Sequence, residues 1–540
     1  MSGEGFNKDI SRRTFVKLAG VALAFPSCNF LKEKNSFPVT ITGSAFKTGH
    51  LLRENKFPEP AETVGVTTLI VGGGISGLSA ARWLKKNGLS DFKLLELDTE
   101  AGGNSKGGEN AVSRYPFAAH YLPIPNEKFQ ELIDFLHEHA VITGFDQNGL
   151  PVYNDYYICF EPEERLFYRG LWQEGLPPKT GLIDEETAEL ARFMKEMDKY
   201  KEHIGSDKRK SFTIPLELSS TDPELMKLDG ITMAEYLERE NYKTPFIRWY
   251  LDYCCKDDFG TSIKNTSAWA ACHYFACRTG KASNADASDV LTWPEGNNFL
   301  AKKLLSEVQS NVELQMLTYK IEQVGDEWHS YVYDVQNQKS IKYVSKSVIL
   351  ATPQFVNKKI LSLQTAVNWD EFSYYPWIVA NITIHDKKSL NGGVELCWDN
   401  VLYNSTSLGY VNACHQSVNV QEKTVLTYYY NFSERSAREE RQEIYSKDEN
   451  YWKNFILEDL RTAHPHIAEH IESVEVNVLG HGMISPVAGF RTSPSRTKLA
   501  EGHSGLYFAH SDVSGISIFE QAFYRGICAA KQALQSNQRA

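Results

Sequence analysis

The sequence predicts an α/β protein in which a discontinuous nucleotide-binding domain is combined with a second, α+β domain. Two observations predict this class. A strand, a glycine-rich loop, a helix and another strand follow one another near residue 70, and strands of the same texture return after residue 290 and near the C-terminus. The blocks between them carry no nucleotide motif. The 540 residues are enough for more than one hydrophobic core.

The first predicted element is a βαβ unit. The apolar, β-branched run Thr67–Val71 predicts a buried strand, and Phe92–Leu95 predicts a second one. Between them, Gly72, Gly74 and Gly77 have G-x-G-x-x-G spacing ahead of a helical pattern. This order is typical of a dinucleotide-binding unit.

The spacing of the glycines suits a pyrophosphate. Gly72 permits the tight turn, Gly74 lets the backbone approach the phosphates, and Gly77 lets the helix lie close to the sheet. The N–H groups at the helix N-terminus attract the negative charge. Glu96 ends the second strand, where an acid accepts hydrogen bonds from an adenosine ribose. The alternative, a glycine-rich turn without a ligand, leaves this context unexplained.

The remaining elements follow from periodicity, since helices repeat apolar residues every three to four positions and strands are apolar, β-branched runs. Helices are predicted over 129–139, 185–203, 232–253, 267–278, 299–309, 452–463 and 519–534, and strands over 312–324, 347–350, 377–384, 425–432 and 505–509. We expect a signal segment over 1–28, a linker with at most one strand over 29–63, a nucleotide-binding domain from 64–125, 290–360 and 475–540, and a substrate domain from 126–289 and 361–474.

Four separated stretches carry a family resemblance. They are the glycine loop with Glu96, then Ala101-Gly102-Gly103, then Val348–Pro353, and finally Leu506–Asp512. In this order they resemble the FAD-dependent amine oxidase superfamily, which includes monoamine and polyamine oxidases, protoporphyrinogen oxidase and carotenoid desaturases. The resemblance covers the nucleotide-binding parts and none of the substrate parts, so it is specific for the fold and for FAD but not for a substrate.

The resemblance implies how FAD is held. The first glycine loop meets the pyrophosphate, Glu96 the adenosine ribose, the backbone of Ile321 the adenine, and Asp512 the ribityl chain. No histidine–cysteine pair signals a covalent link, so non-covalent FAD is expected. The expected cofactor-binding residues are Gly72, Gly74, Ile75, Ser76, Gly77, Glu96, Gly102, Gly103, Asn104, Ile321, Ala351, Asp512 and Phe519.

The chain departs from the family at two positions. The lysine that holds a water near the flavin N5 in amine oxidases is matched by Asn381, and the aromatic-cage tyrosine by Ile518. Both departures argue against a simple amine as substrate. The alternative is that the match is displaced by a few residues.

Few polar residues are candidates for catalysis. They are His120, Asn381 and His481, with His510 in the ribityl loop as a further histidine. A histidine can act as general base near neutral pH, but each one alone is more often structural. Arg491 is either a carboxylate clamp or an ordinary surface or capping arginine.

Three functions remain open. The first is an oxidoreductase that takes a hydride from an amine, amino acid or polyamine to the flavin N5. The second is a desaturase or isomerase of an apolar, polyene-like or lipid-derived substrate, favoured by the aromatic segment 230–290. The third is a non-catalytic flavoprotein that acts as a binding module in the envelope.

Charge and cysteine usage exclude some partners. The chain has 57 basic and 68 acidic residues, a formal net charge of −11, and no basic stripe, which disfavours nucleic acid. Its nine cysteines form no C-x-x-C pair and no Cys/His cluster at metal-ligand spacing, so no metal is expected. Buried free thiols are favoured over disulfides.

The N-terminus predicts export. Ser11–Lys17 followed by the short apolar run Leu18–Phe25 resembles a twin-arginine signal, which is read by the export machinery for folded proteins. We therefore expect a periplasmic or envelope-associated protein. Cys28 is either a lipidated cysteine that anchors the chain to a membrane or an unmodified one, because Phe25 and Pro26 fit a lipobox poorly.

Overall fold

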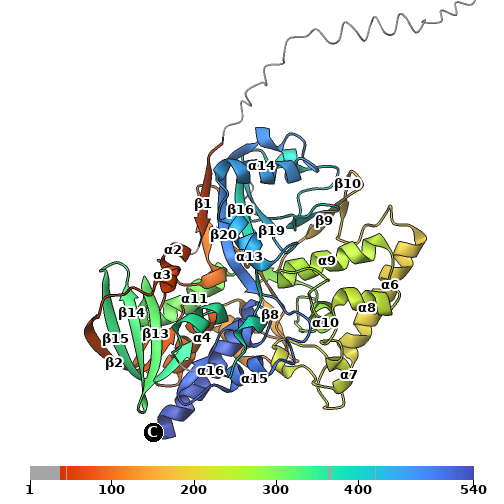
Figure 1. Ribbon diagram of the computed structural model, residues 1–540. Helices are drawn as coiled ribbons and strands as arrows, with labels where there is room; N and C mark the ends of the chain where they lie inside the picture. Colours follow the sequence, from red (N-terminus) through yellow and green to blue (C-terminus); the bar gives the residue numbers. More distant parts are fainter. Residues whose placement is uncertain (1–36, 44, 363–365, 420, 540) are drawn as a thin grey trace, which may run out of the picture. The chain divides into compact units, whose positions relative to one another are not determined.

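The computed structural model describes residues 37–43, 45–362, 366–419 and 421–539 (Figure 1). The chain divides into two units, residues 1–38 and residues 39–540, and the architecture below is that of the second unit. The predicted twin-arginine segment and Cys28 lie outside the described residues. Nothing in the structure therefore tests the export prediction.

The nucleotide-binding sheet contains the predicted βαβ unit. Within the described residues its strand order is β12-β3-β2-β15-β14-β13, with β21 beside β15. β12, β3, β2, β15 and β21 run parallel, while β13, β14 and β15 form an antiparallel meander. The bounds are β2 Pro60–Val71, β3 Phe92–Leu95, β12 Val312–Glu313, β13 Met316–Val324, β14 Glu327–Asp334, β15 Lys339–Leu350 and β21 Leu506–Phe508. This sheet confirms the predicted α/β class.

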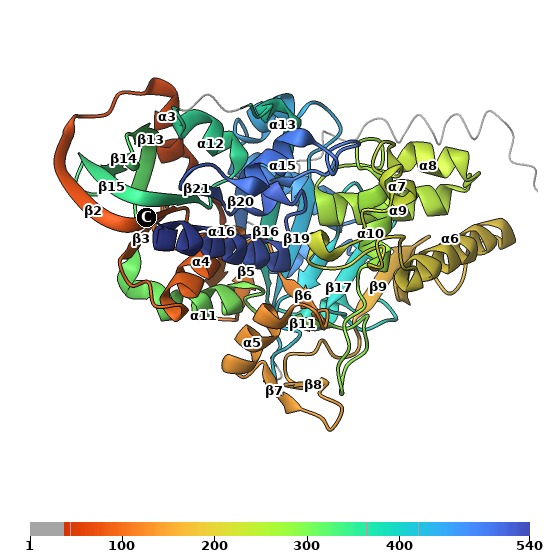
Figure 2. The ribbon, with the colours of Figure 1, turned by 90° about the horizontal axis from the view of Figure 1, so that it is seen from below.

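Helices α4 (Ile75–Lys86) and α16 (Phe519–Arg539) pack on this sheet, and α11 (Asn298–Val308) packs against α4. Figure 2 shows α16 beside α4, next to β2 and β3. The contact is close because Gly526 of α16 faces the Ser76 carbonyl of α4, where any side chain would overlap the carbonyl oxygen. The last helix of the chain is therefore fixed to the first helix of the βαβ unit.

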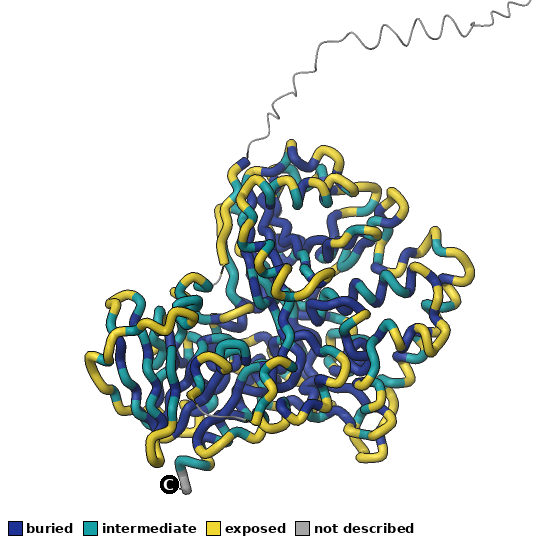
Figure 3. The backbone as a smooth tube through the Cα atoms, viewed as in Figure 1, coloured by how far each residue is buried: buried dark blue, intermediate teal, exposed yellow. Residues whose placement is uncertain are grey.

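A second sheet crosses the predicted domain boundaries. Its strand order is β1-β20-β16-β19-β18-β17-β9-β10. The bounds are β1 Val39–Gly43, β9 Glu164–Tyr168, β10 Leu171–Glu174, β16 Tyr374–Ile384, β17 Asp399–Leu402, β18 Tyr410–Asn412, β19 Thr424–Asn431 and β20 Ile471–Ile484. Figure 3 shows its central strands deeply buried.

Two predicted boundaries are corrected by this sheet. Residues 39–63 are no linker, because β1 pairs in parallel with β20 and β2 already begins at Pro60 of the other sheet. Residues 475–484 belong with the substrate part, because β20 pairs with β16 along its length. The periodicity of β20 is ordinary for a strand, so only its partner decides its domain.

Helices α6 (Asp184–Glu202), α8 (Met233–Arg239), α9 (Pro245–Phe259) and α10 (Ala268–Ala276) pack around one aromatic core (Figure 2). The single helix predicted over 232–253 is wrong. It is two helices, because Pro245 has no N–H to continue a helix and instead occupies the first turn of α9.

Smaller elements complete the unit. They are α2 Phe46–Gly49, α3 Leu51–Glu54, β4 Gly107–Glu109, β5 Arg114–Pro116, β6 Tyr121–Pro123, α5 Gln130–Glu138, β7 Ile142–Phe145, β8 Pro151–Tyr153, α7 Pro223–Met226, β11 Val290–Thr292, α12 Gln354–Ile360, α13 Ala437–Ile444, α14 Glu449–Leu460 and α15 Pro494–Glu501. In the described part of the chain, no helix combines the length and apolarity needed to cross a bilayer.

Candidate active site

The first glycine loop is built by close backbone contacts. Gly72 has a φ of 106°, which favours glycine, and a Cβ there would lie 2.9 Å from the carbonyl carbon and oxygen of Ala351. A Cβ on Gly77 would overlap the Gly72 carbonyl oxygen. The turn out of β2 thus lies directly against the start of α4 and the end of β15, which places Ala351 at the loop as predicted.

The second glycine loop lies against the first. The Gly102 N–H donates to the Gly73 carbonyl at 2.8 Å, and Gly102 and Gly103 have φ values of 134° and 58°. A Cβ on Gly74 would meet only the Gly103 Cα, at 3.9 Å, so open space lies beside the N-terminus of α4.

This open space fits a pyrophosphate. The first helical hydrogen bond of α4 runs from Leu78 N–H to the Gly74 carbonyl, so the N–H groups of Ile75, Ser76 and Gly77 have no acceptor within the helix. Such N–H groups and the positive end of the helix dipole bind phosphate oxygens. The residues present therefore fit the diphosphate of a dinucleotide.

Glu96 lies at the edge of this loop. One carboxylate oxygen accepts the Gly73 N–H at 2.6 Å and the other accepts the Asp98 N–H at 2.8 Å. Burial raises the pKa of Glu96, and the two backbone donors oppose that shift. Each oxygen keeps a further lone pair, so the carboxylate can still accept ribose hydroxyls.

Asp512 and Ile321 are held by protein groups. Asp512 is fully buried, and one of its oxygens accepts the Gln354 N–H at 2.9 Å and the Tyr374 hydroxyl. The Ile321 side chain is fully buried in the hydrophobic core, and its carbonyl accepts the Ser362 N–H at 3.0 Å. The expected contact between the Ile321 backbone and an adenine stays a prediction.

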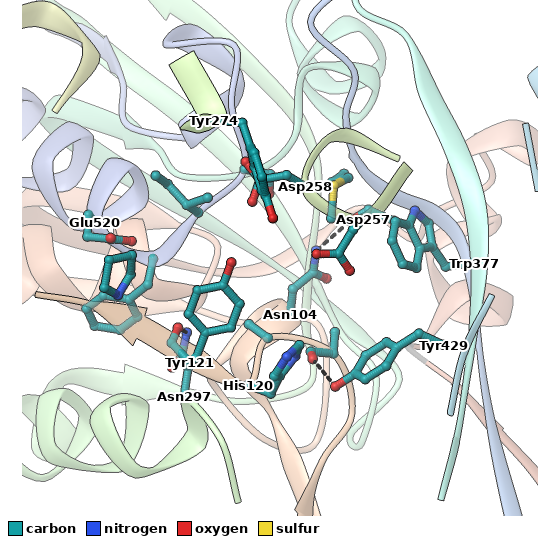
Figure 4. Close-up of a pocket in the computed structure, with 18 of the residues that line it drawn as sticks. Asn104, His120, Tyr121, Asp257, Asp258, Tyr274, Asn297, Trp377, Tyr429 and Glu520 are labelled. Atoms are coloured by element: carbon teal, nitrogen blue, oxygen red, sulfur yellow. Dashed lines mark hydrogen bonds between the residues drawn. The ribbon is translucent and has the colours of Figure 1, made fainter. Parts of the chain in front are cut away.

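A cavity opens next to the second glycine loop. It begins at Asn104, directly after the second glycine loop, and at Phe519, the first residue of α16. It continues between α9, α10 and the central strands of the eight-stranded sheet (Figure 4). One cavity therefore joins the predicted nucleotide site to the substrate part.

Aromatic side chains form much of its wall. Tyr121, Tyr274, Trp377 and Tyr429 line it, and the ring of His120 lies 5.0 Å from that of Tyr429 (Figure 4). Burial lowers the pKa of His120 to about 4, so this histidine is neutral at pH 7. Of the three predicted catalytic residues, His120 is the one that lines the cavity.

Four charged side chains also line the cavity. Asp257 and Asp258 lie in the last turn of α9, Glu520 is the second residue of α16, and Arg278 follows α10. Burial raises the pKa of Asp257 to about 7, that of Asp258 to about 6 and that of Glu520 to about 7, while the positive charge of Arg278 opposes each shift. The cavity therefore carries excess negative charge above neutral pH.

Two predicted catalytic residues lie elsewhere. Asn381 is buried in β16, where its amide donates to the Pro116 carbonyl and accepts from Thr427. Trp377 and Val379, on the same face of β16, line the cavity instead. His481 stacks on Phe355 with a centroid distance of 4.0 Å, outside the cavity lining. Neither residue lines this cavity, and the catalytic roles of Asn381 and His481 stay predictions.

Two other residues that the sequence indicates as candidates, Arg491 and His510, do not line the cavity. Arg491 donates to the Leu216 carbonyl and lies over the Trp269 ring, so it is no clamp for a ligand in this cavity. The Nδ1 atom of His510 lies 2.9 Å from an Asp512 oxygen, behind the cavity wall. Ile518, expected near the flavin, does line the cavity.

The sequence reasoning missed Asp257, Asp258 and Arg278. One signal was present, because two acids in the last turn of a helix oppose its dipole, where basic residues are favoured. Such a placement indicates a role other than helix stability. No local sequence pattern, however, shows that the last turn of α9 lines the same cavity as Arg278, which follows α10.

The comparisons with known proteins agree with this geometry. Residues 70–138 match the profile of the NAD(P)-binding Rossmann-like domain. A flavin-containing amine oxidase of Oncorhynchus mykiss is 22% identical over 303 residues, which are 54% of this chain and 51% of the relative. The chain thus matches about half the length of that curated relative.

Solved structures extend the likeness to most of the chain. A double mutant of putrescine oxidase superposes with a TM-score of 0.64 at 16% identity, covering 88% of this chain and 100% of the other. Cyclohexylamine oxidase from Brevibacterium oxydans gives 0.64 at 14% identity with the same coverage. A fatty acid isomerase from P. acnes gives 0.59 at 13% identity, covering 86% and 98%. The chain shares the fold of these proteins.

Proposed function

We propose that this protein is an FAD-dependent oxidoreductase that oxidises an amine. The observation that carries the proposal is a cavity that reaches Asn104, directly after the second glycine loop, and is also lined by three carboxylates. The names of the relatives support it, since they include a flavin-containing amine oxidase and two oxidases of amines.

The glycine loops would hold FAD without a covalent bond. The N-terminus of α4 and the backbones of Gly74 and Gly103 would bind the diphosphate, and Glu96 the ribose. Asn104 and Phe519 would border the flavin ring, because both face the cavity next to these loops. The bound flavin supplies a two-electron hydride acceptor.

The charged side chains of the cavity would bind the amine. Asp257, Asp258 and Glu520 attract an ammonium group, and the aromatic walls surround its carbon chain. An ammonium must lose a proton before its carbon can release a hydride. Asp257, with a pKa of about 7, can accept a proton at neutral pH.

An isomerase or desaturase of an apolar substrate is the second candidate. The aromatic walls and the likeness to a fatty acid isomerase favour it, and no lysine lines the cavity among the described residues. Three carboxylates and an arginine in the same cavity count against it, because an apolar substrate would leave those charges without partners.

The test is anaerobic reduction of the bound flavin. Protein fully loaded with FAD is mixed with primary amines, diamines and amino acids, and the absorption of oxidised flavin is followed. Bleaching by an amine, followed by return of the colour with an electron acceptor, is expected. If light-driven reduction bleaches the flavin and none of these compounds does, the proposal is wrong.

We also propose export by the twin-arginine route, on the sequence of residues 11–25 alone. Replacing Arg12 and Arg13 by lysine should leave the protein in the cytoplasm of an expressing bacterium. Equal amounts of both forms outside the inner membrane would contradict this proposal.

A further inference from the structure

The four charged side chains of the cavity lack ionic partners. Within the described residues, no carboxylate oxygen lies within 4.0 Å of the Arg278 guanidinium. Its one hydrogen bond runs from Nη2 to the Tyr121 hydroxyl at 2.7 Å, and its charge lies 5.3 and 5.5 Å from the ring centres of Tyr121 and Tyr274. Asp257, Asp258 and Glu520 likewise have no cation within 4.0 Å.

Two other buried arginines of this chain have more hydrogen-bond or ion-pair partners than Arg278. Arg82 forms ion pairs with Glu138 and Glu307. Arg165 is fully buried, and all three of its guanidinium nitrogens donate, to neutral oxygens. Within the described residues, Arg278 donates a hydrogen bond from one nitrogen only, and its side chain lines the cavity. Unpaired charges of both signs in a half-buried cavity are costly to the fold, so they indicate a ligand that completes them.

We propose that the substrate is an amino acid: an amine that also carries a carboxylate, which Arg278 binds while Asp257, Asp258 and Glu520 face the ammonium. This inference rests on the proposed function and names its substrate class. A planar guanidinium with two free donors matches a carboxylate in a bidentate pair. The Arg278 guanidinium packs against the aromatic rings of Tyr121 and Tyr274.

Simpler ligands match the cavity less well. A diamine would balance the negative charge of the three acids but would leave the Arg278 guanidinium without a partner. A carboxylic acid without an amine would add a fourth carboxylate to the three present. With three acids against one arginine, the cavity keeps negative charge after a zwitterion binds. A basic side chain on the amino acid is therefore favoured and an acidic one is excluded.

The test compares each amino acid with the amine that lacks its carboxylate. Lysine is paired with 1,5-diaminopentane and leucine with 3-methylbutylamine, and kcat/KM is measured for the holoprotein and for Arg278→Met. We expect kcat/KM of the variant to fall about 100-fold or more further with the amino acids than with the matched amines, in line with loss of a bidentate pair. Loss of the Arg278 charge also shifts the pKa values of Asp257, Asp258 and Glu520, but it does so for both classes of substrate alike.

Two further variants guard against a folding effect. Arg278→Lys keeps the charge without the planar pair, and we expect an intermediate loss confined to amino acids. Tyr121→Phe removes the hydroxyl that holds Arg278, and a loss of about fivefold is expected, again with amino acids alone. Flavin content shows whether each variant is folded.

Binding gives a readout that is independent of turnover. The probe is 2-aminoisobutyrate, an amino acid with no hydrogen on its α carbon, titrated calorimetrically into the oxidised holoprotein. We expect it to bind the unchanged protein and to bind Arg278→Met at least about 50-fold more weakly.

The outcomes separate the two proposals. If amines bleach the flavin and amino acids do not, the amino acid proposal is wrong and the amine oxidoreductase remains. If Arg278→Met slows amines and amino acids equally, Arg278 serves the flavin or the fold and the amino acid proposal is wrong. If neither class bleaches the flavin, the proposed function is wrong as well.

Discussion

The glycine loops and the charged part of the cavity are built by different means. The glycine loops are made of backbone, from Gly72, Gly77 and Gly103, held by contacts that leave little or no room for side chains. The charged part of the cavity is made of side chains from α9, α16 and the segment after α10. Backbone geometry suits the cofactor, because the cofactor is the same in every turnover. Side chains suit the substrate, because the site must distinguish it from similar small molecules.

The largest expected effect comes from a pair of glycine variants. Gly77→Ala should prevent folding or flavin loading, because its Cβ overlaps the Gly72 carbonyl oxygen and the backbone must move. Gly74→Ala should fold, since its Cβ enters open space, but bind FAD about 100-fold more weakly because that space is where the diphosphate would lie. Flavin content and the melting temperature of the flavin-free protein measure both.

A third glycine provides the control for this pair. Gly65 lies in β2, and a Cβ there meets nothing within 4 Å, so Gly65→Ala should keep both flavin and stability. Equal flavin affinity in Gly74→Ala and the unchanged protein would contradict the assignment of the diphosphate to this space.

The next effect tests the charged part of the cavity. The double variant Asp257→Asn with Asp258→Asn should lower kcat/KM for an amine about 100-fold while flavin content stays the same, because two of the three carboxylates that face the ammonium are lost. Steady-state kinetics measure this. Asp198→Asn, an exposed acid of α6, is the matched control and should change nothing. An unchanged kcat/KM in the double variant would exclude these acids from substrate binding.

A smaller change in kcat/KM is expected when the pH is lowered. The pKa values of Asp257, Asp258 and Glu520 are raised to about 7, 6 and 7, so these groups become neutral as the pH falls below them. Affinity for an ammonium should therefore fall with decreasing pH, and kcat/KM should drop about tenfold or more between pH 8 and pH 5. The profile of Asp257→Asn should be flatter. A profile that is identical in the variant would assign the titration to another group.

The smallest kinetic effect is expected at Asn381, a predicted catalytic residue that does not line the cavity. Asn381→Ala should cost about 1–3 kcal/mol of unfolding free energy, because the Pro116 carbonyl and the Thr427 hydroxyl lose their partner, yet change kcat/KM less than about threefold. Denaturant unfolding and kinetics measure the two quantities. A large kinetic loss with unchanged stability would return Asn381 to the active site.

The same contrast explains how much the sequence could predict. The βαβ unit and both glycine loops were predicted because their residues are neighbours in the chain and each glycine has a local steric reason. The charged part of the cavity joins Asp257, Arg278 and Glu520 through tertiary contacts that no periodicity records. The position of Asn381 outside the cavity lining has a related cause, because alternation along β16 fixes a face but not which of its residues reaches the cavity.

The central claim is that the glycine loops and the charged part of the cavity form one site. A crystal structure of the protein loaded with FAD tests this most directly. The account predicts the diphosphate at the N-terminus of α4 and the flavin ring in the cavity next to Asn104 and Phe519, with Asp257 and Arg278 across the remaining space. A flavin ring outside this cavity, or a diphosphate away from Gly74, would contradict it.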